Sequence, residues 1–125
     1  MSELKTELKE PRELSIDEWR ILNKMLSVDF DGKDIISIQL KSTKVVGHCS
    51  CGCKTIDIKV GSNLPKYEYK KRVPIELRIF SEDEVPIITS IHVVNGYINE
   101  LEIIRADSKA ITEKIILENA IIEIY

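Results

Sequence analysis

All three cysteines of this 125-residue chain, and one of its two histidines, lie within the six residues 48–53, which read HCSCGC. Thiolates and imidazoles are ligands of soft metal ions, and thiols also undergo redox chemistry. This stretch is therefore the strongest chemical signal in the sequence. It is open to three interpretations: a metal site, a redox loop, and a tight turn filled by small side chains.

The candidate ligands of a metal site are His48, Cys49, Cys51 and Cys53. Structural zinc sites usually draw four ligands from two separate knuckles, and outside this stretch the sequence offers only His92. Alternate residues of an extended strand lie roughly 6.5 Å apart, so the backbone must curl, at Gly52, before the thiolates can converge. Two of the thiols could still bind a soft ion such as copper(I), with partners from elsewhere.

A redox loop requires a cation or a helix N-terminus that lowers the pKa of a cysteine. His48 and Lys54 flank the stretch, but the sequence predicts no helix start beside it. The third interpretation is a tight hairpin turn between strands at 44–48 and 55–60, in which cysteine acts as a small apolar side chain. The sequence favours this turn, and with it a protein without a cofactor.

The sequence contains no arrangement typical of an enzyme. It lacks a G-x-S-x-G elbow, a glycine-rich phosphate loop and EF-hand spacing. His92 lies in a predicted strand, where histidine is most often a hydrogen-bonded or surface residue, and Glu100 and Glu102 are interpreted as a solvated strand face. We therefore expect a non-enzymatic protein.

The composition is that of a globular protein, with 43% hydrophobic and 31% charged residues. A net charge of -3 disfavours a nucleic-acid binder, which is normally basic. No apolar run approaches the roughly 18 residues that span a bilayer, and residues 1–12 lack the apolar centre of a signal peptide. Because the cysteines are odd in number and too close for a disulfide framework, we expect a cytoplasmic protein.

Two helices are predicted in the N-terminal third of the chain. Ser15 and Glu18 form a capping-box pattern that starts a helix ending near Val28. Asp31 is the predicted cap of a second, shorter helix that extends to Leu40. Beyond it, alternating apolar residues predict strands at 44–48, 55–60 and 72–79, and the apolar tail at 115–125 predicts a closing strand.

The dipeptide Asn95-Gly96 predicts a hairpin between residues 85–94 and 97–105. A strict two-residue turn would place Glu100 and Glu102 on the apolar face of this hairpin. Either both faces are partly covered, or a β-bulge shifts the register by one residue.

The predicted fold is α+β, with two N-terminal helices packed on one face of an antiparallel sheet of five to six strands. Residues 1–12 are rich in lysine and glutamate and are expected to form a flexible N-terminal arm. Residues 13–125 are expected to form a single α+β domain.

The function that the sequence favours is protein interaction. The candidate contact residues are aromatic, basic or acidic and lie in predicted loops or at a strand start: Tyr67, Tyr69, Arg72, Glu82, Asp83 and Glu84. An acidic domain without catalytic groups suits an immunity protein that neutralises a cognate, basic bacterial toxin. We expect no nucleic-acid or membrane partner, and a homodimer through the tail or a sheet edge is left open. The alternative is a metal-binding or redox-active protein that uses Cys49, Cys51 and Cys53.

Two segments carry a resemblance to a family of small bacterial proteins. One is the C-x-C-G-C stretch at 49–53, and the other is 92–103, which follows the pattern H-V-x-x-G-Y-x-x-E-L-E-I. The resemblance covers most of residues 12–107, and it implies a helical N-terminal third without an assigned activity. Proline often follows the cysteines in similar sequences, where this chain has Lys54, so the turn is expected to be less rigid here.

Overall fold

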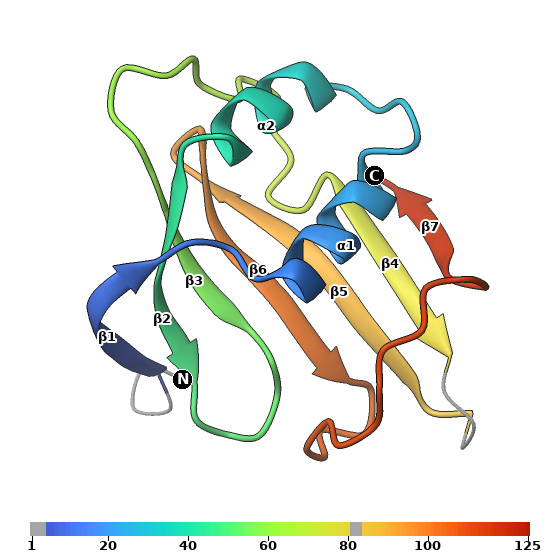
Figure 1. The fold of residues 1–125 in the computed structure, drawn as a ribbon. Coiled ribbons are helices and arrows are strands. Elements are labelled where there is room, and N and C mark those ends of the chain that lie inside the picture. Colours follow the sequence, from blue (N-terminus) through green and yellow to red (C-terminus); the bar gives the residue numbers. More distant parts are fainter. Residues whose placement is uncertain (1–4, 81–83) are drawn as a thin grey trace.

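The computed structural model describes residues 5–80 and 84–125, and within them the chain forms one antiparallel sheet and two helices (Figure 1). In chain order the elements are β1 (Lys5–Arg12), α1 (Ile16–Met25), α2 (Lys33–Leu40), β2 (Thr43–Cys49), β3 (Ile56–Val60), β4 (Ile75–Phe80), β5 (Pro86–Val94), β6 (Tyr97–Arg105) and β7 (Ile121–Ile124). In this described part of the chain, no helix has the length and apolar character needed to cross a membrane.

The described residues contribute seven strands to the sheet, in the order β1-β2-β3-β6-β5-β4-β7. This is one strand more than the upper end of the predicted five to six, because the segment expected to be a flexible arm forms β1 and pairs with β2. An edge strand can be held by backbone hydrogen bonds along one side, so its sequence carries little apolar pattern. The tail contributes less than predicted, since only Ile121–Ile124 pairs with β4.

Helix α1 begins at the predicted capping box. The Ser15 hydroxyl accepts a hydrogen bond from the Glu18 backbone N–H at 3.1 Å, and the Glu18 carboxylate accepts one from the Ser15 N–H at 2.8 Å. Helix α2 has no side-chain cap, which corrects the prediction for Asp31: its N-cap is Gly32, at φ 82°. Glycine is required there, because a Cβ at this position would collide with the ring of Tyr67.

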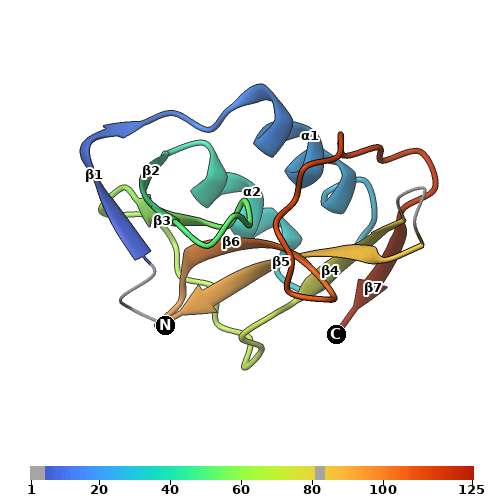
Figure 2. The ribbon, with the colours of Figure 1, turned by 90° about the horizontal axis from the view of Figure 1, so that it is seen from below.

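Both helices bury apolar side chains against the sheet. Figure 2 shows the two helices beside the sheet, where α1 contacts β4 and α2 contacts β6. The buried residues that they contribute are Ile21, Leu22, Met25, Ile36 and Leu40, and the strands below contribute Ile75, Leu77, Ile87, Ile91, Leu101 and Ile103.

The β5–β6 hairpin contains the bulge that the sequence left as one of two alternatives. Val94 pairs with Tyr97 across the predicted turn, but His92 pairs with Glu100, so Asn99 is an extra residue in β6. A bulge of this kind exchanges the faces of all residues that follow it.

The bulge separates the apolar and acidic residues of β6. Ile98, Leu101 and Ile103 all lie at 2% exposure or less on the core face. Glu100 and Glu102 are placed on the opposite face, together with His92 of β5. Two carboxylates thus avoid the core and meet a histidine.

An ion pair between Glu18 of α1 and Arg12 of β1 joins these two elements. The Arg12 guanidinium donates to both Glu18 carboxylate oxygens at 2.9 Å, and the Glu18 side chain is 11% exposed. Burial alone would raise the pKa of Glu18, but the hydrogen bonds from Arg12 and Ser15 outweigh it, so the pKa of this carboxyl is lowered. The folded state therefore favours the charged form.

Glu18→Gln is expected to lower the free energy of unfolding at pH 7 by about 1–2 kcal/mol, because the charge-assisted contacts are lost. Since the folded-state pKa lies below the unfolded one, the contribution of the carboxylate is present above about pH 4.3 and is lost as the pH falls through the folded-state pKa. Urea titrations from pH 7 to 3 should show wild type and variant converging. A constant difference across that range would contradict this role, and Asp17→Asn, with a side chain 81% exposed, is the control.

Candidate metal centre

The three cysteines lie at the β2–β3 turn. Cys49 is the last residue of β2, and Cys51 and Cys53 belong to the turn that leads to β3. Gly52 has φ 98°, a left-handed conformation that glycine adopts without strain, so the backbone curls as the metal hypothesis requires. A Cβ at Gly52 would lie 2.7 Å from the Cβ of Ala110, so the position also has no room for a side chain.

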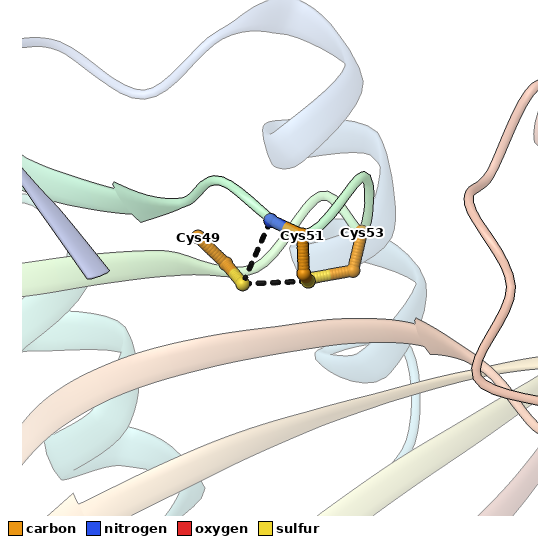
Figure 3. A group of neighbouring side chains, drawn as sticks. All are labelled: Cys49, Cys51 and Cys53. Atoms are coloured by element: carbon orange, nitrogen blue, oxygen red, sulfur yellow. Dashed lines mark hydrogen bonds between the residues drawn. The ribbon is translucent and has the colours of Figure 1, made fainter. Parts of the chain in front are cut away.

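The curl brings the three sulfur atoms together (Figure 3). The Sγ of Cys51 lies 2.6 Å from that of Cys49 and 3.0 Å from that of Cys53, and all three sulfurs are within 4.8 Å of one another. These separations exceed the about 2.05 Å of a disulfide bond, and the cysteines are free. The backbone N–H of Cys51 also donates to the Sγ of Cys49, at 3.4 Å.

The pKa values of Cys49 and Cys51 are shifted in opposite directions. Hydrogen bonds from the Cys49 and Cys53 thiols lower the pKa of Cys51 to about 7. Burial and the hydrogen bond that it gives to Cys51 raise the pKa of Cys49 to about 11. The first negative charge in the cluster is therefore held by the central, exposed sulfur.

Neighbouring backbone fixes the turn that carries the cysteines. Cys49 N–H donates to the Thr55 carbonyl at 3.1 Å, Lys54 N–H to Ile103 of β6 at 3.0 Å, and Ile111 N–H to Gly52 at 3.1 Å. The turn is thus hydrogen-bonded to the sheet and to the segment after β6.

Arg105 forms ion pairs within residues 106–113, the segment that donates a hydrogen bond to Gly52. Its side chain is 9% exposed and donates to the Asp107 carboxylate at 2.9 and 3.0 Å and to Glu113 at 2.7 Å. These contacts lower the pKa of Asp107 and close residues 106–113 into a compact loop beside the cysteine turn.

His48 does not join the cysteine cluster. The group of ligand atoms within 4.8 Å of one another consists of the three sulfurs, whereas the His48 Nδ1 lies 3.2 Å from the Cys49 carbonyl oxygen. His48, Cys49 and Cys53 instead border a cavity of about 600 Å³ between the turn, the start of α1 and residues 112–117.

The predicted partner-binding residues fall into three groups. Tyr69, Arg72 and Glu84 are exposed, whereas Tyr67 is 3% exposed, which corrects its interpretation as a surface tyrosine. The Tyr67 ring packs beside Gly32 and Tyr69, with the two tyrosine centroids 5.3 Å apart. Glu82 and Asp83 lie outside the described residues.

The structure brings together a second group that sequence analysis treated as separate surface residues. His92, Glu100 and Glu102 offer one nitrogen and two carboxylate oxygens within 4.8 Å of one another. A sequence signal for it exists: the buried residues Ile98 and Leu101 are three apart rather than two, which is the spacing of a bulged strand.

The cysteine cluster presents three soft sulfur donors on one side of a turn that is hydrogen-bonded to the sheet, an arrangement that suits a thiophilic metal ion. Comparisons of the chain with family models, with curated proteins and with solved structures gave no match. The resemblance to a family of small bacterial proteins therefore stays a prediction, and the side-chain geometry is the basis for a functional proposal.

Proposed function

We propose that this protein binds a thiophilic metal ion, copper(I) in the first place, through Cys49, Cys51 and Cys53. The observation that carries the proposal is the convergence of three free thiols within 4.8 Å at the anchored β2–β3 turn. Metal thiolates require reduced cysteines, so the proposal also assumes a reducing compartment such as the cytoplasm.

The spacing of the sulfurs supports a single ion. A metal–sulfur bond of about 2.3 Å places the sulfurs about 4 Å apart around a trigonal ion. The observed 2.6 and 3.0 Å contacts need to open by about 1.4 and about 1.0 Å, which rotations of the cysteine side chains supply.

The number of ligands favours copper(I) over zinc. A structural zinc ion takes four protein ligands, and His48, the nearest imidazole in sequence, lies outside the group of converging atoms. Copper(I) is among the ions that soft thiolates select. Zinc would need a fourth ligand, and the exposed side of Cys51 leaves that position to solvent.

The test is a competition titration of the reduced protein with copper(I) against a chromophoric chelator, under anaerobic conditions. We expect one equivalent to be taken from the chelator, and zinc to be bound more weakly than copper(I). A protein that leaves copper(I) on a chelator of micromolar affinity would contradict the proposal.

A second candidate function is binding of a basic protein, as an immunity protein would bind a cognate toxin. It assumes that the helices cover one face of the sheet and leave the other open. The observation that favours it is the strand register, which aligns five half-buried carboxylates on that face: Asp57, Glu76, Glu100, Glu102 and Glu123. Such a face would steer a basic partner, with the exposed Tyr69, Arg72 and Glu84 as further contacts.

Cross-linking in native lysate tests this second function. A stoichiometric basic partner should be captured by the wild type and lost on Glu76→Lys with Glu123→Lys. Glu118→Lys with Asp29→Lys, at two exposed loop positions, is the charge-matched control. Absence of a stoichiometric protein partner would contradict the interaction function.

A further inference from the structure

Strands β5 and β6 carry a polar cluster on the face opposite Ile91 and Leu101. Cross-strand pairing sets Ser90 opposite Glu102 and His92 opposite Glu100. Residues directly opposite in an antiparallel pair share a face, so the four side chains form a square on two neighbouring strands. The cluster exists because of the bulge at Asn99, which places both glutamates on this face.

The donor atoms of the cluster are spaced almost evenly. His92 Nε2 lies 3.3 Å from Glu102 Oε1, and Ser90 Oγ lies 3.2 Å from each of these atoms. Glu100 Oε1 lies 3.9 Å from His92 Nε2. Metal–nitrogen and metal–oxygen bonds of about 2.1 Å put neighbouring ligands about 3.0–3.4 Å apart. The three distances among Ser90, His92 and Glu102 match this spacing, and Glu100 would need to move about 0.5 Å closer to His92.

The same distances fit an ion pair less well. Charge-assisted hydrogen bonds between a cation and a carboxylate are usually about 2.7–2.9 Å long, shorter than either histidine–glutamate distance. A single Nε2–H can also donate to one carboxylate only, whereas a cation between the donors contacts all of them.

The cluster is recessed but accessible. His92, Glu100 and Glu102 have side chains 15%, 17% and 33% exposed, and Ser90 is 2% exposed. A cavity of about 370 Å³ opens over Ser90, His92 and Glu102. An ion can therefore enter from solvent and meet two negative charges that are only partly hydrated.

We propose that Ser90, His92, Glu100 and Glu102 form a site for a divalent first-row transition-metal ion, separate from the cysteine cluster. One imidazole and two carboxylates are a ligand set for zinc or manganese rather than for a soft monovalent ion. His92 and the two glutamates bind the ion directly, and the Ser90 hydroxyl either completes the set or orients Glu102. The site lies on different strands from the thiols and takes a harder ion.

The test uses the full chain with Cys49, Cys51 and Cys53 replaced by serine, so that the thiols cannot contribute and failure of the copper proposal does not affect the result. Calorimetric titrations with zinc and manganese, and optical titration with cobalt(II), should show one saturable equivalent. The cobalt spectrum should have the bands of nitrogen and oxygen ligands. Absence of saturable binding of all three ions would overturn the proposal.

Two variants locate the site. His92→Asn should weaken binding by at least about tenfold, since loss of an outer-shell partner alone has that effect. His48→Asn, the matched histidine control, should leave it unchanged. Glu102→Gln is nearly isosteric and lies at a more exposed position, so its metal affinity tests the site if His92→Asn fails to fold. Unchanged affinity in the folded His92 or Glu102 variant overturns the assignment.

Discussion

Cys51→Ser is expected to weaken copper(I) binding by more than about a hundredfold, or about 2.7 kcal/mol. Cys51 is the central thiol, within 3.0 Å of both other sulfurs. A serine hydroxyl is a hard donor that keeps its proton at neutral pH, so two soft ligands remain in place of three. The measurement is the chelator competition, carried out on variant and wild type side by side.

The Cys51→Ser experiment has a matched control and an outcome that would contradict the proposal. Ser50→Ala alters the same turn without removing a thiol, and it should bind copper(I) as the wild type does. Because Cys51 is exposed, the free energy of unfolding of the metal-free variant should lie within about 0.5 kcal/mol of the wild-type value. Wild-type affinity in Cys51→Ser would show that the thiols do not act together.

Gln39→Leu is expected to lower the free energy of unfolding by about 3 kcal/mol, the largest effect of a single substitution on stability that we predict. Gln39 is fully buried in α2 and uses both ends of its amide. Its Nε2 donates to the carbonyls of Pro65 at 2.8 Å and Gly96 at 2.9 Å, and its Oε1 accepts from the Ile98 N–H at 3.0 Å. Leucine fills the space but leaves buried backbone groups without this partner.

A second substitution at the same position tests the mechanism. Gln39→Glu keeps the acceptor for Ile98 but turns a carboxylate toward the two carbonyls, so it should be at least as destabilising at pH 7 and recover in part at low pH. Urea unfolding is the measurement, with Asn23→Leu on the exposed side of α1 as control. A decrease of less than about 1 kcal/mol in the free energy of unfolding for Gln39→Leu would contradict the structural role of the Gln39 hydrogen bonds.

The elements that the sequence predicted well are those with a strong local signal. The capping box at Ser15, the turn at Asn95-Gly96 and the alternating β3 and β4 all occur where predicted. Each depends on residues that are close in the chain, so tertiary contacts had little to change. The segment at β1 has no such signal, because edge pairing uses backbone groups and leaves most side chains in solvent.

The candidate sites depend on contacts that a sequence pattern does not specify. Periodicity predicted a hairpin but allowed two registers, and the burial of Ile98 and Leu101 decides between them. Tyr67 lies in a charged loop and was predicted to be exposed, yet it is buried against Gly32. The convergence of the thiols required a curl that Gly52 permits, and partners distant in sequence, Ile103 and Ile111, hold it.

X-ray absorption spectroscopy of the copper(I)-loaded protein is the most direct test of the cysteine site. We predict a copper first shell of three sulfur atoms at about 2.3 Å, with no nitrogen or oxygen ligand. A first shell that contains nitrogen or oxygen, or only two sulfurs, would contradict the three-thiolate site.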